Sequence, residues 1–427
     1  MRAMSPRLPG NAELRIPAIL LSCLLFVCGY AGKGVGEVLS ATGKGDTLEA
    51  ETSRTEANEP EELWPVTPIR TSWDDLLEGI ESPEAWAEKR KVIKRQFHDL
   101  ILNDAAPEPP ADLDVKVEKE IDGDGFRILY ISYQVESDER AHAYLGIPDA
   151  PPPEGGFPGV VCLHGTTDWG ARRTLGLRPN PGDPRAAKPS RTRGKDYARY
   201  LVRNGYVTIS PEHFCCATRT PPEGSFDTAA FYRKHPKWSA VGKYIYDSKI
   251  ACSVLAARPE VNADRLGVTG HSLGGHGSIW LAACDDRIRC VSPSCGGGTF
   301  RENPLPLNWS RDHWYVYLPQ LREDILAGRR IVPDLHEIMA LIAPRPLLDR
   351  FALNDGLPLA QAHKVMLHVK VHEVYRLLGA EGAHAFYVFG DGHSVTDQSR
   401  ECLVSWMDRW LKYDGDAWGA RQRHILR

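Results

Sequence analysis

Hydrophobic and polar positions follow two different patterns along this chain. Residues 126–135 and 141–147 are rich in β-branched and aromatic residues and flank a charged turn, which predicts an antiparallel pair of strands. From residue 157 onward, short apolar runs alternate with segments whose apolar residues recur at helical spacing. We predict strands at 159–163, 206–210, 265–269, 288–292, 346–353 and 384–389, and helices at 195–204, 239–257, 273–283, 334–342, 360–378 and 398–411. This alternation predicts an α/β fold with a mostly parallel central sheet covered by helices on both faces.

The amino-terminal segments differ from the rest in composition. Residues 1–31 have the pattern of a secretory signal peptide, because arginines precede a short apolar run and small residues follow it. We therefore expect a periplasmic or secreted protein with no stable membrane insertion after cleavage. An uncleaved membrane anchor is the alternative, although the apolar run is shorter than the ~20 residues that span a bilayer. Residues 32–68 contain few large apolar side chains, which predicts a disordered linker.

Residues 69–427 are expected to form one large domain in three parts. An extension at 69–150 contains the antiparallel strands and a helix that begins after Ser82, with Val92 among its apolar residues. The core is expected at 157–412, and an insertion at about 296–333 without helix–strand alternation predicts a cap. In the helix at 239–257, the apolar residues gather toward one face, and Lys243, Asp247 and Lys249 are expected to be solvated.

Composition adds little about partners. Apolar residues make up 42% of the chain and charged residues 25%, with a net charge of −4, which is typical of a soluble globular protein and gives no reason to expect a nucleic-acid partner. The oligomeric state stays open. Eight cysteines follow the predicted signal peptide, and Cys284 and Cys290 could form a disulfide across a short loop.

Ser272 lies in Gly270-His-Ser-Leu-Gly274. This segment fits the pattern G-x-S-x-G, but a pattern this short also occurs by chance. Its context is more specific, because the predicted strand 265–269 runs directly into it and a helix follows at once. Glycines at both ends of the pattern allow a sharp turn that exposes the serine hydroxyl. We therefore interpret Ser272 as a candidate nucleophile. His271 and His276 are expected to pack around it.

A serine nucleophile requires a base, and the base requires an acid that fixes its tautomer. Asp355 follows a predicted strand in an Asn-Asp-Gly turn, and His393 lies in a glycine-flanked loop after the last strand. Both positions are at the carboxyl edge of the sheet, where open α/β sheets bind ligands. Asp349 is the alternative acid, and His384 and His363 are the alternative bases, although each is placed less well relative to that edge.

The oxyanion of acyl transfer requires two hydrogen-bond donors. We expect the backbone N–H of Leu273 to be one of them. The strand at 159–163 ends in a His-Gly turn, and the N–H of Gly165 or Thr166 is expected to be the other.

The segments LHGTTDWG, GHSLGGHGS, SPSCGGGTF, APRPLLDRFALNDG and GDGHSVTD resemble successive landmarks of the α/β-hydrolase superfamily, in its dienelactone hydrolase and acetyl xylan esterase-like branch. The resemblance covers roughly residues 157–412 and implies an α/β-hydrolase fold with Ser272 as nucleophile, Asp355 as acid and His393 as base. Dienelactone hydrolases have cysteine at the nucleophile position, so the serine favours an esterase.

Several residues are candidates for substrate binding. Arg172 and Arg173 belong to a basic segment after the predicted oxyanion loop and could attract an acidic polysaccharide, although an ordinary solvated surface is the favoured explanation. Trp309, Trp314 and Tyr315 could stack on a sugar or pack the cap. His368 and His372 stand four residues apart, but no third ligand is evident, and we expect neither a metal nor a cofactor.

These residues together predict an exported serine hydrolase that cleaves carboxylic esters, with acyl or methyl esters of carbohydrates as the expected small-molecule or polysaccharide substrates. A serine peptidase of the prolyl oligopeptidase kind is a second hypothesis. A carbohydrate-binding protein with a vestigial triad is a third.

Overall fold

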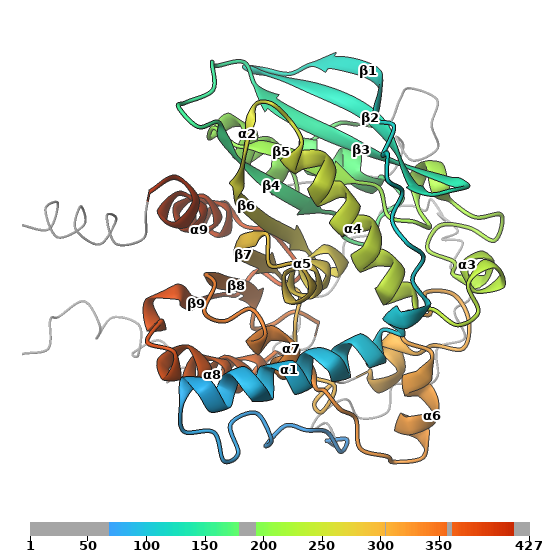
Figure 1. Ribbon diagram of the computed structural model, residues 1–427, viewed down its shortest axis with the longest axis vertical. Helices are drawn as coiled ribbons and strands as arrows, with labels where there is room; N and C mark the ends of the chain where they lie inside the picture. Colours follow the sequence, from blue (N-terminus) through green and yellow to red (C-terminus); the bar gives the residue numbers. More distant parts are fainter. Residues whose placement is uncertain (1–67, 179–193, 304, 357–360, 414–427) are drawn as a thin grey trace, which may run out of the picture. The chain divides into compact units, whose positions relative to one another are not determined.

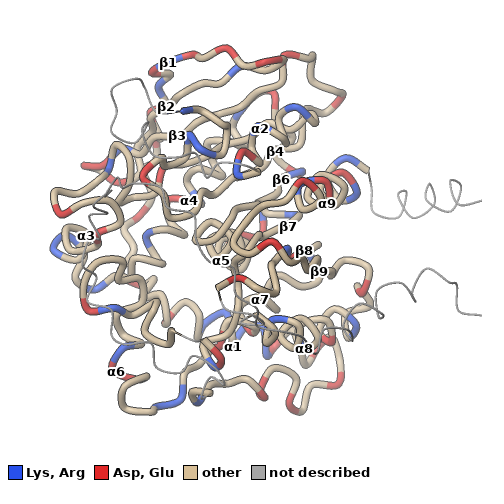
Figure 2. The backbone as a smooth tube through the Cα atoms, turned by 180° about the vertical axis from the view of Figure 1, so that it is seen from behind, with Lys and Arg blue, Asp and Glu red and all other residues tan. Residues whose placement is uncertain are grey.

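The computed structural model in Figure 1 describes residues 68–178, 194–303, 305–356 and 361–413. The predicted signal peptide at 1–31 and all but the last residue of the predicted linker at 32–68 lie outside these residues. In the described part of the chain, no helix is both long and apolar enough to cross a membrane. Basic and acidic residues are interspersed along the described backbone (Figure 2).

The described strands form one nine-stranded sheet in the order β1-β2-β3-β5-β4-β6-β7-β8-β9. Their bounds are β1 Lys116–Asp122, β2 Phe126–Glu136, β3 Glu139–Pro148, β4 Phe157–Leu163, β5 Val207–Pro211, β6 Val261–His271, β7 Ile288–Ser294, β8 Leu347–Ala352 and β9 His384–Phe389. Strands β4 to β9 run parallel to one another. Strands β1, β2 and β3 pair in antiparallel fashion, and β3 pairs antiparallel with β5, which connects the two parts of the sheet. The predicted α/β fold with a mostly parallel sheet is therefore confirmed.

Helices cover both faces of this sheet. The described helices are α1 Pro83–Leu100, α2 Tyr197–Arg203, α3 Ala229–Lys234, α4 Ala240–Ala256, α5 Leu273–Cys284, α6 Gln320–Leu326, α7 Leu335–Ala340, α8 His363–Leu377 and α9 Asp397–Met407. One apolar core lies between the sheet and α1, α4, α5, α7 and α8, and a second lies between the sheet and α2 and α9. Figure 1 shows α2 and α9 on the opposite side of the parallel strands from α4 and α5.

Helix α1 begins as predicted, because the Ser82 side chain accepts a hydrogen bond from the N–H of Ala85. Val92, which the spacing placed with the apolar residues of this helix, is 52% exposed and does not belong to the core. Strand β1 was not predicted, because its residues are charged and almost all exposed at the edge of the sheet.

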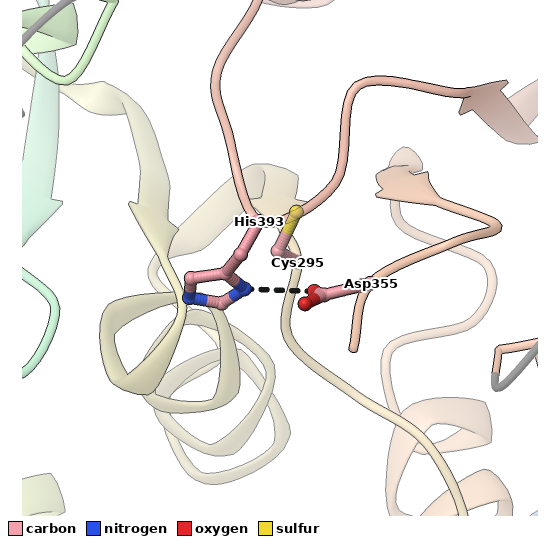
Figure 3. Close-up of side chains that lie close together, drawn as sticks. All are labelled: Cys295, Asp355 and His393. Carbon is pink, nitrogen blue, oxygen red and sulfur yellow. Dashed lines mark hydrogen bonds and ion pairs between the residues drawn. The ribbon is translucent and has the colours of Figure 1, made fainter. Parts of the chain in front are cut away.

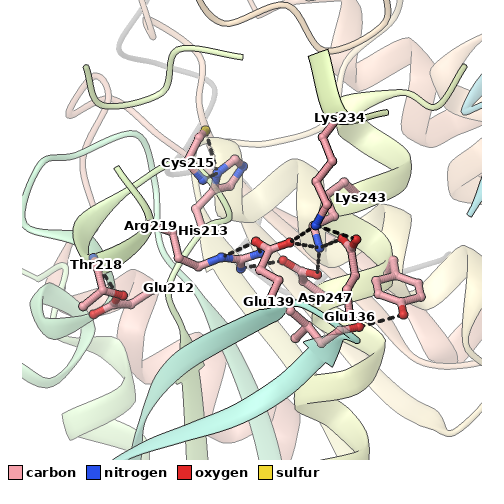
Figure 4. Close-up of polar contacts among 12 residues, drawn as sticks. Glu136, Glu139, Glu212, His213, Cys215, Thr218, Arg219, Lys234, Lys243 and Asp247 are labelled. Atoms are coloured by element: carbon pink, nitrogen blue, oxygen red, sulfur yellow. Dashed lines mark hydrogen bonds and ion pairs between the residues drawn. The ribbon is translucent and has the colours of Figure 1, made fainter. Parts of the chain in front are cut away.

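The prediction that Lys243 and Asp247 are solvated is wrong. Both side chains are buried in α4, where they pair with each other at 3.0 Å. Lys243 also contacts Glu136 and Glu139, and Arg219 contacts Asp247 at 2.6 Å (Figure 4). These partners come from the β2–β3 hairpin and from the segment after β5, so their charges satisfy one another inside the protein.

Cys284 and Cys290 do not form the disulfide that their spacing allowed. Cys290, in β7, belongs to the core beneath α2 and α9, whereas Cys284, at the end of α5, packs against the other core. The two thiols therefore lie on opposite faces of the sheet. Thiols on opposite faces are not brought together by the short loop between them.

Candidate active site

The turn at Ser272 joins β6 to α5 in a strained conformation. The φ and ψ angles of Ser272 are 61° and −121°, in a region that residues with a side chain rarely adopt. Its N–H donates a hydrogen bond of 2.8 Å to the carbonyl of Ser294. A Cβ atom at Gly270 would collide with the Gly274 carbonyl, and one at Gly274 would collide with the Leu163 carbonyl. Both glycines are thus required by the close approach of the turn to the end of β4.

His393 and Asp355 meet at the carboxyl edge of the sheet. The distance from His393 Nδ1 to Asp355 Oδ2 is 2.7 Å, and 45% of the His393 side chain is exposed, against 18% for Asp355. An ionised carboxylate only accepts hydrogen bonds, so Nδ1 carries the proton and Nε2 remains available as a base in the neutral ring.

The surroundings of His393 change its basicity. Burial lowers the pKa of His393, but the hydrogen bond and charge of Asp355, with a further contribution from Cys295, raise it to about 9. The neighbouring ring of His271, whose centroid lies 4.6 Å from that of His393, behaves differently. Burial holds the pKa of His271 well below its ordinary value, so this ring stays neutral beside His393.

The loop after β4 lies against the serine. A Cβ atom at Gly165 would be 3.2 Å from the Cβ of Ser272, so a larger residue here would push the two segments apart by a few tenths of an ångström. His164 Nε2 accepts a hydrogen bond from the N–H of His213 at 3.2 Å, and its Nδ1 therefore donates to the Gly165 carbonyl at 2.8 Å. Because C=O and N–H of a trans peptide point in opposite directions, this bond directs the Thr166 N–H away from His164.

Two cavities meet at His393. A small one of about 70 Å³ is lined by Ser272, Gly165, Thr166 and His393. A larger one of about 370 Å³ is lined by His393 and Asp355 together with Trp309 and Lys364. Ser272 and His393 thus line the same cavity, and the Asp355 carboxylate is bonded to Nδ1 of the His393 ring.

Known proteins share parts of this sequence. No family model matches the chain. "Putative hydrolase YtaP" of Bacillus subtilis (strain 168) is 31% identical over 170 residues, which are 40% of this chain and 54% of that protein. Carbohydrate esterase MZ0003, from an unknown prokaryotic organism, is 27% identical over 158 residues, which are 35% of this chain and 36% of that protein. The matched region thus spans about half of the first relative and about a third of the second.

A solved structure matches a much larger share of the chain. The glucuronoyl esterase from Solibacter usitatus superposes with a TM-score of 0.60 at 18% identity, over 83% of this chain and 99% of that chain. The chain has the α/β-hydrolase fold. The resemblance noted in the sequence is confirmed at this level, and the elements of the α/β-hydrolase fold carry the predicted site residues at the ends of β4, β6, β8 and β9.

The candidate substrate-binding residues of this α/β-hydrolase fold separate into groups. Trp309 lines the larger cavity, and Arg173 lines the smaller one. The hydroxyl of Tyr315 lies 2.7 Å from Thr166 Oγ1, so this ring supports the loop after β4. Trp314 is 42% exposed, with its indole N–H bonded to the Ser225 carbonyl, and it is not among the residues that line either cavity. Arg172 points to a separate cavity of about 510 Å³ on the β2–β3 side.

The alternative acid and base belong to a different network. Asp349 is buried within β8, and its Oδ2 lies 3.0 Å from Nε2 of His368. Nδ1 of His368 lies 3.2 Å from Nε2 of His384, whose own Nδ1 lies 3.2 Å from His372. The third alternative, His363, lines the larger cavity.

Sequence reasoning missed three residues at this site. The Asn354 amide donates a hydrogen bond of 2.7 Å to the Gly390 carbonyl and accepts one of 3.0 Å from the Gly392 N–H, so it ties the Asp355 loop to the His393 loop. The buried ammonium of Lys364 lines the larger cavity and donates to the Gly296 carbonyl at 2.6 Å. Cys295 lies beside His393 and Asp355. In the sequence, Asn354 is the first residue of the Asn-Asp-Gly turn and Cys295 lies in the SPSCGGGTF segment, but neither pattern indicates the contacts that these residues make.

Proposed function

We propose that this protein is an exported serine esterase that hydrolyses carboxylic esters of carbohydrates through Ser272, His393 and Asp355. The observation that carries the proposal is the Nδ1–carboxylate bond of 2.7 Å on a histidine that lines the same cavity as a strained serine. Because the acid is bonded to Nδ1, Nε2 of His393 is the ring nitrogen left to act on a substrate.

In the proposed reaction, Ser272 Oγ attacks the acyl carbon while His393 Nε2 takes the hydroxyl proton. Asp355 keeps the ring in the required tautomer and stabilises the imidazolium. Collapse of the tetrahedral intermediate breaks the ester bond, and His393 returns the proton to the leaving alcohol. A water molecule then attacks the acyl-enzyme with His393 again as base, which releases the acid and regenerates Ser272.

The negative oxygen of the intermediate requires donors on the opposite side from His393. The N–H of Leu273 is at the first turn of α5, where backbone donors have no partner within the helix. The Thr166 N–H, directed by the bond between His164 and Gly165, is the second proposed donor. Each donor of this kind lowers the barrier by roughly 3 kcal/mol.

A carbohydrate ester is the proposed substrate class for two reasons. The matched relatives include a protein named as a carbohydrate esterase and a solved glucuronoyl esterase. In addition, the larger cavity combines an indole ring, Trp309, with the amides of Asn303, Asn308 and Gln361. Aromatic rings stack on the apolar faces of sugars, and amides bond their hydroxyl groups.

The test of the reaction is labelling by a fluorophosphonate together with hydrolysis of an aryl acetate. Wild-type protein should label rapidly at Ser272 and release a burst of product, whereas Ser272→Ala should do neither. Ser253→Ala, a matched control on the exposed side of α4, should behave as wild type. Equal labelling of Ser272→Ala and wild type would remove the proposed nucleophile, and absence of labelling in both would favour a vestigial site.

The substrate class is tested separately with natural esters. Acetylated xylan and methyl glucuronate esters should be compared by the release of acetate and of methanol, with Ser272→Ala as the blank. Hydrolysis of peptide bonds instead of these esters would contradict the proposal. Export is tested by the amino terminus of the mature protein, which should begin near residue 32.

A further inference from the structure

Three potential metal ligands meet at the edge of the larger cavity. The Cys295 sulfur, an Asp355 carboxylate oxygen and a His393 ring nitrogen all lie within 4.8 Å of one another. They come from the segments that follow β7, β8 and β9, and Figure 3 shows the thiol and the carboxylate on the same side of the His393 ring. The side chain of Cys295 is 6% exposed, but it lines the cavity together with the other two residues.

We infer that Cys295, Asp355 and His393 form a binding site for a thiophilic divalent metal ion such as Zn²⁺, and that metal bound there switches the enzyme off. Thiolate, carboxylate and imidazole are the ligand types that zinc prefers, and three protein ligands leave a fourth tetrahedral position open to water. The two anionic ligands balance the charge of the ion.

The geometry needs only small movements to close around an ion. Zinc binds sulfur at about 2.3 Å and nitrogen or oxygen at about 2.0–2.2 Å, which places tetrahedral ligand atoms about 3.3–3.8 Å from one another. His393 Nδ1 and Asp355 Oδ2 are now 2.7 Å apart because a proton lies between them. An ion that replaces this proton would move the two atoms apart by less than ~1 Å.

Inhibition follows from the tautomer of His393. As the Zn–N, Zn–S and Zn–O bonds form, the Cys295 thiol releases its proton to solvent, and the single ring proton of neutral His393 moves from Nδ1 to Nε2 by exchange with solvent. A neutral imidazole that coordinates through Nδ1 carries its remaining proton on Nε2. Nε2 then has no lone pair to take the proton from Ser272. The inference about inhibition therefore rests on the proposed function, whereas the metal site itself does not.

Cadmium titration of the full-length protein reads the site directly. Cd²⁺ should produce a saturable ultraviolet sulfur-to-metal charge-transfer band, and Zn²⁺ should abolish it by competition. Cys295→Ser should lose the band and bind at least about tenfold more weakly. Cys402→Ser, which removes a partly exposed thiol that does not line this cavity, should keep it. The surface group His98, Asp99 and Asp104 also lies within ligand distance, but it contains no sulfur and gives no such band.

The outcomes separate the two proposals. Loss of the band in Cys295→Ser, with an unchanged melting temperature, supports the site; Cys295→Ala repeats the test with a second side chain. An equal band in wild type and Cys295→Ser, or no saturable band in wild type, overturns it. Zn²⁺ should inhibit wild type at concentrations at least about tenfold lower than Cys295→Ser, each relative to its own rate in chelator. Metal bound through Cys295 without loss of turnover would overturn the role of His393 as base and leave the site standing.

Discussion

Asn354 lies in the loop that carries Asp355, and its amide bonds to the backbone of the neighbouring loop that carries His393. Among the described residues, no other side chain of the Asp355 loop does so. Asn354→Ala removes two hydrogen bonds, of 2.7 and 3.0 Å. Both are exposed, so each contributes about 0.5–1 kcal/mol, at the lower end of the usual range. The pair is therefore worth about 1–2 kcal/mol, which corresponds to a change of about 5- to 30-fold in the equilibrium that holds the loops together.

We expect Asn354→Ala to lower kcat for an aryl acetate by up to that factor, with little change in KM. The loss should be accompanied by a shift of the acidic limb of the pH profile to lower pH. The pKa of His393 is about 9 only while Asp355 stays bonded to it, and separation of the loops returns it toward its ordinary value. The assay is steady-state hydrolysis across pH in buffer that contains a chelator.

Asn204→Ala is the matched control, because its amide donates a comparable bond of 2.8 Å to the Tyr200 carbonyl in α2, on another part of the chain. It should lose little stability and no activity. A kcat for Asn354→Ala within twofold of wild type, with an unmoved pH profile, would refute the reasoning that this amide positions the base.

Three further predictions follow from other contacts. Asp355→Asn should lower the maximal kcat/KM by about 10²–10⁴-fold and move its acidic limb to lower pH, because the pKa of His393 falls when the carboxylate is lost; an unmoved limb would contradict this. Gly274→Ala should lower the free energy of unfolding in urea by about 1–3 kcal/mol because its Cβ meets backbone of β4, whereas Gly382→Ala, whose nearest neighbour is the end of a flexible arginine at 3.6 Å, should not. Lys243→Met should lower the free energy of unfolding by about 3–5 kcal/mol, because it leaves buried carboxylates unpaired. In the same urea experiment, Lys249→Met on the exposed side of α4 should leave the free energy of unfolding within about 0.5 kcal/mol of wild type.

The sheet could be predicted because its signal is local. Strands such as β4 and β5 are buried along their whole length and therefore appear as nearly continuous apolar runs, and each covering helix shows its own period. The places of Asp355 and His393 follow from the same rule, since strands that run parallel end at one edge. Within the described chain, the six predicted parallel strands and the antiparallel pair are all present.

The errors concern residues whose environment is set by distant segments. Lys243 and Asp247 have the spacing of a solvated helix face, yet Glu136 and Arg219 arrive from more than 25 residues away and make their burial tolerable. Asn354 and Cys295 are of the same kind, because their neighbours are determined by how three loops pack together. No pattern within one segment contains this information.

Two aspartates, Asp349 in β8 and Asp355 in the turn after it, could serve as the acid. The exposure of their histidine partners distinguishes them, whereas the carboxylate–histidine distances do not. Asp355 and Asp349 each lie close to a histidine nitrogen, at 2.7 and 3.0 Å, so either pair has the spacing of an acid–base couple. His368, however, is fully buried and has its second nitrogen bonded to His384, which leaves no atom for a substrate. His393 has 45% of its side chain exposed and lines the cavity of Ser272. A base must exchange its proton with substrate and water, and only His393 of these two can do so.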